Sequence, residues 1–408
     1  MTTTMTKVRS VFWLVLIAVG LACALAGSAS AGGFAVAEQT ALAGGSGGAS
    51  TARAQDPGAA WYNPAALADG AGVRVGIGLL AALPSINAEA MDGSWQTSSE
   101  SGVATPPHLN LSYANGDIAL GVAAGVPFGA GVTWPDDWAG RHEILSTNLE
   151  VFRVAPFLAW RFGKLRVSGG VHADFARLRI NRTLDFVDTE GDVKLDMTGN
   201  AIGFDAAAFY AASPNVDVGV SYKSRSKIAV TGGADFTAPD AFSVKTTDQN
   251  VSSTVNLPDR IATGVRYRRG KLSLLGDVIV TLWGVNRQTV IDFEIEDTPD
   301  VVQENDWSTT VGLRAGGEYQ LRRGVVVRGG AFFDPTPAPA DRLAPTSPDA
   351  DRVGITLGGS YQLSHHYVVD VFYEYMQLLG RETMDTNALQ ARYNGHAHML
   401  GLGLRHNQ

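Results

Sequence analysis

The sequence predicts an all-β protein, a 14-stranded antiparallel transmembrane β-barrel. Three observations predict it. The chain begins with a leader typical of exported proteins. A segment rich in glycine and alanine follows, and it ends in the turn Asn63-Pro64-Ala65. From Val73 to the end, stretches of about ten residues are apolar at every second position and are separated by turn residues, which is the pattern of a membrane barrel.

The leader predicts a signal peptide spanning residues 1–31. Lys7 and Arg9 precede an apolar run at 11–26, and Ala29-Ser30-Ala31 supplies the small-x-small pattern of a cleavage site, so we expect cleavage after Ala31. The apolar run is shorter than the ~20 residues that a membrane helix needs. Lipoprotein processing at Cys23 is the other alternative, but the residues before Cys23 are a poor version of the usual approach to such a site.

Composition excludes several classes of function. Cys23 is the single cysteine of the sequence, so the mature chain has none and cannot form a disulfide, a thiolate metal site or a cysteine nucleophile. A net charge of -8 argues against a nucleic acid as partner, because nucleic-acid binding depends on clustered positive charge. After the leader we find no helical periodicity long enough to build a soluble domain, which leaves one all-strand body.

The stretch Leu165 to Phe175 illustrates the alternation. One face carries Leu, Val, Gly, Val, Ala and Phe, and the other carries Arg, Ser, Gly, His and Asp. Short polar links predict turns at one end of the barrel, and longer stretches predict loops at the other, extracellular end. The predicted strands are 72–82, 107–114, 117–126, 148–161, 164–182, 197–212, 215–230, 253–268, 271–290, 307–320, 323–334, 351–363, 366–378 and 393–406.

A set of short strings, in order along the chain, resembles one known family. The strings are Trp61 to Ala65, Pro127 to Gly129, Trp134 to Arg141, Ser221 to Ser224, Asn256 to Asp259, Gly317 to Gln320, Phe333 to Pro337, Pro348 to Arg352 and Gly359 to Tyr361. Together they resemble the FadL-type outer-membrane family of long-chain fatty-acid transporters and toluene-type hydrocarbon channels. The chain departs from it at the C-terminus, which lacks the terminal aromatic residue common in such barrels and so leaves its recognition by the assembly machinery open.

The resemblance implies a monomeric barrel at residues 72–408 whose N-terminal segment, residues 32–71, folds inside the lumen as a plug. Within the plug, Pro64 restricts Asn63 to extended conformations and fixes the turn at Ala65. The resemblance also implies that ligands leave sideways through a kink in the third strand. Residues that weaken a strand there, and are therefore our candidates for a lateral opening, are Gly121, Gly125 and Pro127.

Four residues are candidates for ligand binding. Phe128, Trp134 and Trp138 would form an apolar collecting groove, or would alternatively pack their loop onto the barrel rim. Arg314 would face the lumen and would bind a fatty-acid carboxylate, or would alternatively pair with a carboxylate of the wall. The same alternatives hold for other lumen-facing cations, namely Lys223, Arg266 and Arg268, with Asp217, Asp277, Glu318, Asp370 and Glu374 as possible partners.

The resulting functional expectation is passive uptake of hydrophobic small molecules, either fatty acids or aromatic or alkane hydrocarbons, through the outer membrane of a Gram-negative cell. Outer-membrane lipid, lipopolysaccharide and the barrel-assembly machinery are the other expected partners, and we expect no cofactor. We expect no metal site, because His365-His366 and the pair His396 and His398 lack a third ligand at fitting spacing. Two alternatives are a barrel enzyme of phospholipase type, with Ser168 and His172, and a general diffusion porin, which would lack a plug.

Overall fold

The computed structural model describes residues 33–407 except 55, 101, 187, 243–245 and 385–388. The expected signal peptide and Cys23 therefore lie outside the described residues. Within these bounds, no helix has both the length and the apolar character needed to cross a membrane.

The described chain forms a closed, antiparallel 14-strand barrel, which confirms the predicted fold class. It closes where the first strand pairs with the last, from Arg74 and Asn407 to Ala90 and Ala391. The strands are β1 (Gly70–Ala90), β2 (Gln96–Ser98), β3 (Pro107–Gly116), β4 (Ile118–Thr133), β5 (Ser146–Phe162), β6 (Leu165–Asp185), β7 (Glu190–Ser213), β8 (Val216–Lys223), β9 (Ser226–Thr237), β10 (Gln249–Leu257), β11 (Asp259–Arg269), β12 (Leu272–Leu282), β13 (Gln288–Phe293), β14 (Val301–Glu304), β15 (Thr310–Arg322), β16 (Val325–Asp334), β17 (Arg352–Gln362), β18 (Tyr367–Glu382) and β19 (Ala391–Asn407).

Three transmembrane strands consist of two pieces each. β8 and β9 both pair with β7, and the strand that contains them is interrupted at Ser224 and Arg225. β10 and β11 are separated by Pro258, which has no N–H to donate to a ladder. The predicted single strands 215–230, 253–268 and 271–290 are therefore interrupted, the last one by the short 3₁₀ helix η3 (Trp283–Val285).

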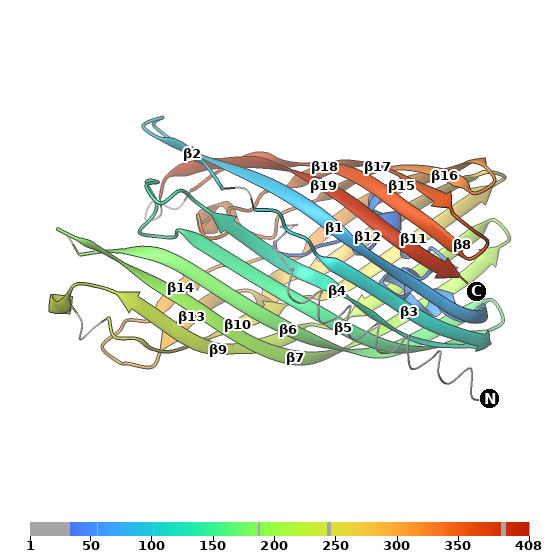
Figure 1. Ribbon diagram of the computed structural model, residues 1–408, viewed down its shortest axis with the longest axis horizontal. Coiled ribbons are helices and arrows are strands. Elements are labelled where there is room, and N and C mark those ends of the chain that lie inside the picture. Colours follow the sequence, from blue (N-terminus) through green and yellow to red (C-terminus); the bar gives the residue numbers. More distant parts are fainter. Residues whose placement is uncertain are drawn as a thin grey trace.

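Long and short connections lie at opposite ends of the barrel (Figure 1). Four of the short turns use glycines with positive φ angles of 59 to 78°, which residues with a Cβ rarely adopt. These glycines are Gly116, Gly163, Gly270 and Gly324. Outward-facing side chains are large and apolar, as the lipid phase requires; the side chains of Ile202 and Leu357 are 76% and 68% exposed.

Residues 33–69, here called the N-terminal segment, lie among the strands near the end with short turns (Figure 1). The segment contains α2 (Ala41–Gly44), α3 (Ala59–Tyr62) and the 3₁₀ helix η1 (Pro64–Leu67). α2 contacts β17, β18 and β19, while η1 contacts β5, β6 and β7 on another side of the barrel. Two further 3₁₀ helices, η2 (Asp240–Phe242) and η4 (Ala340–Arg342), lie in the long connections.

Candidate functional site

The wall of the barrel is interrupted beside its third transmembrane strand, β4. The ladder between β3 and β4 stops at the pair formed by Leu109 and Ala124. The ladder between β4 and β5 is irregular between Gly125 and Phe128. Pro127 lies within this irregular stretch and lacks a backbone donor. Beyond Ala124, the edge of β4 that faces β3 is therefore free to pair with something other than the wall.

The N-terminal segment pairs with this free edge. The amide of Val36 donates to the carbonyl oxygen of Pro127 at 2.8 Å, and the amide of Gly129 donates to the carbonyl oxygen of Phe34 at 2.8 Å. A third bond, 2.7 Å long, runs from the side-chain amide of Gln39 to the carbonyl oxygen of the residue before Pro127. Backbone groups that would otherwise be left unsatisfied at the break are thus bonded, which lowers the cost of opening the wall.

Gly125 and Pro127, two of the predicted opening residues, lie at this break, whereas Gly121 lies before it. Gly121 pairs with Ser112 of β3 and with Phe157 of β5, inside both ladders. Gly125 faces the N-terminal segment, because a Cβ added to it would lie 2.6 Å from the side-chain oxygen of Gln39.

An apolar groove of about 580 Å³ lies on the outer side of the break. Leu109, Ala124 and Phe152 line it beside the break, and Leu79 and Leu402 line it on the neighbouring strands. The side chains of Leu79 and Leu402 are 43% and 59% exposed and face outward, where the lipid of the membrane would contact them. The break therefore opens towards the lipid phase.

A second cavity, of about 510 Å³, lies inside the barrel among the long connections, and we call it the chamber. It receives side chains from the ends of the strands and from four of the long loops. Its wall is built mainly from lumen-facing aliphatic residues, which include Leu149, Leu178, Leu195, Val255 and Ile291. Such a lining favours a ligand with extensive apolar surface.

Aromatic rings close the bottom of the chamber. The ring of Phe34 lies 4.8 Å from that of Trp283, 5.5 Å from that of Trp307 and 5.8 Å from that of Phe128. Phe34 and Trp307 line the chamber directly, while Phe128 belongs to the irregular stretch of β4. Phe34 therefore lies between the chamber and the break in the wall.

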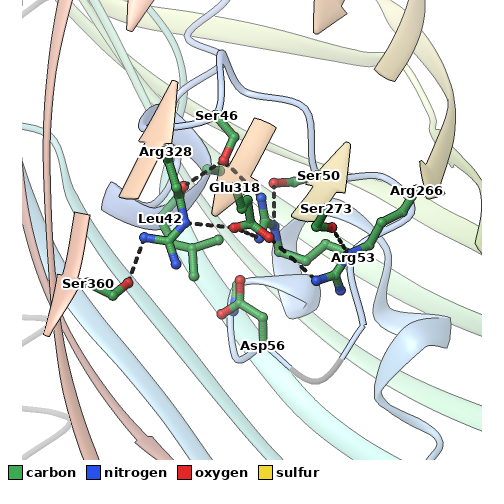
Figure 2. Close-up of polar contacts among 12 residues, drawn as sticks. Leu42, Ser46, Ser50, Arg53, Asp56, Arg266, Ser273, Glu318, Arg328 and Ser360 are labelled. Carbon is green, nitrogen blue, oxygen red and sulfur yellow. Dashed lines mark hydrogen bonds and ion pairs between the residues drawn. The ribbon is translucent and has the colours of Figure 1, made fainter. Parts of the chain in front are cut away.

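A buried carboxylate of the wall anchors the N-terminal segment (Figure 2). Glu318 of β15 pairs with Arg53 of the segment at 2.5 Å, with Arg328 of β16 at 2.7 Å and with Arg266 of β11 at 3.4 Å. The side chains of Arg53 and Glu318 are 5% and 8% exposed. Arg53 also donates to the hydroxyl of Ser46 at 3.0 Å, so the ion pair fixes two parts of the segment at once.

Wall glycines let the backbone of the segment approach closely. A Cβ on Gly330 would lie 2.3 Å from the amide nitrogen of Gly47, and one on Gly316 would lie 2.4 Å from the carbonyl oxygen of Ser46. Gly47 itself has a φ of +64°, which favours glycine. The glycine-rich stretch of the segment is thus a close-packed contact with the wall.

Hydrogen bonds fix the segment on other sides. Asp277 of β12 accepts from the amides of Ser50 and Thr51, both at 2.9 Å. The phenol of Tyr62 accepts from the amide of Gln39 at 2.8 Å, and burial raises the pKa of Tyr62. The phenol therefore remains neutral and bonded at physiological pH.

The predicted plug motif is buried at the contact between the segment and β7. The side-chain amide of Asn63 donates to the carbonyl oxygens of Thr51 at 2.9 Å and Ala208 at 3.0 Å. Pro64 starts η1, where a missing N–H costs nothing because the first helical amides have no partner in the helix. Ala65 is fully buried.

Trp134 and Trp138 hold a long loop together. Their rings stack at 4.7 Å and are almost fully buried, and Tyr393 lies next to them. Their ring nitrogens donate to the carbonyl oxygens of Pro345 and Ile144. Neither tryptophan lines the chamber. This placement matches the packing alternative for these two residues.

Arg314 is held by carboxylates deep below the chamber. It pairs with Asp334 of β16 at 2.5 Å and with Glu38 of the N-terminal segment at 3.2 Å. The arrangement matches the alternative in which Arg314 pairs with the wall. Sequence reasoning did not single out Phe34, Trp283 and Trp307, because only tertiary pairing brings these distant residues together.

His172 lies in a closed polar network. Its ring nitrogens lie 3.1 Å from an oxygen of Asp205 and 3.3 Å from the hydroxyl of Ser226, and that hydroxyl donates to Asp174 at 2.7 Å. The side chain of His172 has no exposed area, so a substrate cannot reach it. Across the described residues, no group of three or more His, Cys, Asp or Glu side chains is arranged to hold a metal ion.

Comparison with known proteins agrees with this geometry. The family model described as "Outer membrane protein transport protein (OMPP1/FadL/TodX)" matches residues 22–407. A Neisseria meningitidis serogroup B protein whose name places it in the outer membrane is 24% identical, over 92% of this chain and 95% of that protein. The fold is similar to that of a Pseudomonas aeruginosa FadL homologue, with a TM-score of 0.82 at 18% identity, covering 92% of this chain and 99% of the other. It is also similar to that of the P. putida toluene transporter TodX, with a TM-score of 0.71 at 16% identity, covering 90% and 98%.

Proposed function

We propose that this chain, which belongs to the outer-membrane transport family OMPP1/FadL/TodX, takes up hydrophobic small molecules by capture in the chamber and lateral release beside β4. The family places the protein in the outer membrane. The observation that carries the proposal is the position of the break in β4. Phe34 and Phe128 lie between the apolar chamber on one side and the apolar groove on the other.

Hydrophobic transfer supplies the driving force for this route. Each Å² of apolar surface that leaves water contributes about 25 cal/mol, and a sideways exit from the chamber into lipid keeps that surface out of water. A sideways exit keeps the ligand away from the charged contacts around Glu318 and Arg53 nearer the short-turn end. Passage requires Phe34 to move, so the hydrogen bonds of Val36 and Gln39 to β4 must break or shift with it.

The N-terminal segment acts as the plug in this proposal. Its ion pairs and close backbone contacts on several sides of the wall support closure of the lumen, which disfavours the general diffusion porin. The protein works as a monomer, without a catalytic step, a cofactor or a metal. Its outer face contacts lipid and lipopolysaccharide, and the barrel-assembly machinery inserts it.

Blocking the groove tests the lateral route. Ala124 lines the groove beside the break and is buried there, so Ala124→Trp fills it from the outer side. Ala173→Trp is the matched control, because Ala173 lies on β6 between the exposed, outward-facing Val171 and Phe175. In cells that rely on this transporter, Ala124→Trp should abolish uptake of labelled palmitate and of labelled toluene, whereas Ala173→Trp should leave it unchanged. Undiminished uptake by a folded Ala124→Trp barrel would favour axial passage instead.

A further inference from the structure

The end of the barrel with short turns carries a cluster of exposed cations, which we call the basic rim. It consists of Arg269, Lys271, Arg322 and Arg323. The first two lie at the turn between β11 and β12, and the last two lie at the turn between β15 and β16. All four residues are exposed, and within the described chain none of them forms an ion pair with a carboxylate.

The two turns of the basic rim lie side by side, because β12 pairs with β15. The amide of Gln320 donates to the carbonyl oxygen of Lys271 at 3.0 Å, and the ammonium group of Lys271 donates to the carbonyl oxygen of Leu321 at 3.5 Å. Four positive charges are thus concentrated on two adjacent turns of a chain whose net charge is -8. Such a concentration creates a local field that attracts anions.

The neighbouring turns supply no carboxylate that would offset this charge. β11 also pairs with β8, and β16 also pairs with β17, so the flanking turns are residues 213–215 and residues 363–366. The first of these turns is uncharged, and the second contains two histidines and no acidic residue. Two carboxylates of the adjoining strands, Asp217 and Glu318, are buried on the lumen side, where each is paired with an arginine outside the basic rim.

Outward-facing apolar side chains lie directly beside the basic rim. Tyr267 of β11 and Tyr319 of β15 are 38% and 45% exposed, and they precede the two turns by only a few residues. Leu272 pairs with Tyr319 across the ladder and is also exposed, as is Leu321. Outward-facing tyrosines are typical of the boundary between hydrocarbon and head groups, and short turns are typical of the periplasmic end. The basic rim therefore lies at the level of the head groups of the inner leaflet.

We propose that the basic rim binds an anionic phospholipid of the inner leaflet, and that it prefers a lipid with two phosphates, of the cardiolipin type, to a zwitterionic one. Guanidinium and ammonium groups donate charge-assisted hydrogen bonds to phosphate oxygens. Two phosphates held together in one head group match four clustered cations, whereas the amine of a zwitterionic head group adds a positive charge that the cluster repels.

The acyl chains of such a lipid have an apolar surface to lie against. With the phosphates at the turns, the chains extend along the outer face of β11, β12 and β15, where Leu272, Leu274 and Leu313 are exposed. This site lies on the outside of the barrel, and none of its four cations lines the chamber or the apolar groove. The inference therefore goes beyond transport and does not depend on the route that a ligand takes.

Native mass spectrometry of the full barrel in a non-ionic detergent, titrated with cardiolipin or with phosphatidylethanolamine, tests the inference. The double variant Arg322→Gln with Arg323→Gln should weaken cardiolipin binding about ten- to thirtyfold, because each cation beside an anionic lipid contributes a factor of about five. Adding Arg269→Gln and Lys271→Gln should abolish the preference for cardiolipin. Neither variant should change the binding of phosphatidylethanolamine. Raising the salt concentration should weaken cardiolipin binding by the wild type more than by the quadruple variant.

The matched control is Arg177→Gln with Arg179→Gln. It also removes two exposed arginines, but each of them is paired with a carboxylate near the end with long connections, so neither lipid affinity should change. Equal affinity of the wild type for the two lipids would overturn the inference. Unchanged cardiolipin affinity in the quadruple variant would also overturn it and would leave the basic rim to an acidic protein of the periplasm. Heat-modifiable migration on gels verifies folding of each variant.

Discussion

Replacing Glu318 by glutamine should release the N-terminal segment from the lumen. Three arginines converge on this carboxylate, but they depend on it unequally (Figure 2). Arg328 also lies 3.6 Å from Asp370 and donates to a serine of β17, and Arg266 keeps its bond to a serine of β12. Among the described residues, Arg53 keeps only the hydroxyl groups of Ser46 and Ser50 in its own segment. The substitution therefore weakens mainly the contact between the segment and the wall.

The magnitude follows from burial. Removing one partner of a buried ion pair costs about 3–5 kcal/mol, because the remaining charge is left desolvated. Such a change shifts the docking equilibrium of the segment by roughly two to four orders of magnitude. Arg53→Met should cost less, since Glu318 would still have Arg328 and Arg266 beside it. The barrel itself should persist, because Glu318→Gln leaves unchanged the backbone through which this residue pairs with β12 and β16.

Single-channel conductance in planar bilayers measures the outcome. Glu318→Gln should raise the conductance or the frequency of open events well above those of the wild type, with Arg53→Met in between. Asp196→Asn makes the same change of carboxylate to amide in a pair whose two side chains are about half exposed, so it should behave like the wild type. If Glu318→Gln conducts no more than Asp196→Asn, the ion pair does not hold the segment in place.

Four further outcomes are expected. Deleting residues 32–66 should give the largest conductance in the same assay, and unchanged conductance would mean that the segment does not close the lumen. Asp277→Ala should raise conductance moderately, because two amides of the segment lose their acceptor. Gly330→Val should also displace the segment, whereas Gly169→Val should not, because a Cβ at Gly169 meets nothing within 4 Å; equal conductance of the two variants would contradict the close-packing argument. Intact mass should show cleavage after Ala31, and a retained leader or attached lipid would contradict this.

Much of the wall could be predicted from sequence because the alternation that identifies a membrane strand lies within the strand itself. In a strand that separates lipid from lumen, each side chain faces one medium or the other, so the period of two is visible without knowledge of the partners. β6 was predicted at 164–182 and extends over Leu165–Asp185. The strand interruption at Ser224 and Arg225 carried no such signal, since neither residue lacks a donor or favours a turn strongly.

The candidate site depended on contacts that no local pattern shows. Pro127 marks a weak position in β4, but the sequence does not indicate that residues near Val36 pair with its carbonyl oxygen. Gly125 suggests a gap in side-chain coverage, yet in the fold it makes room for Gln39. A bulky residue at Gly125 would therefore push on the N-terminal segment rather than fill the outer groove.

The inward-facing cations show even more clearly that sequence patterns do not reveal tertiary contacts. By alternation alone, Arg314 and Arg182 are equivalent, since each occupies a lumen-facing position of its strand. What separates them is the supply of carboxylates from distant parts of the chain: Arg314 receives Glu38, which is 276 residues away in sequence, and Arg182 receives none from the described chain. An arginine whose charge is neutralised by a carboxylate stabilises the closed barrel, whereas a partly buried arginine without such a partner bears the cost of its desolvation. Which lumen-facing arginines are neutralised is therefore a property that only the folded structure reveals.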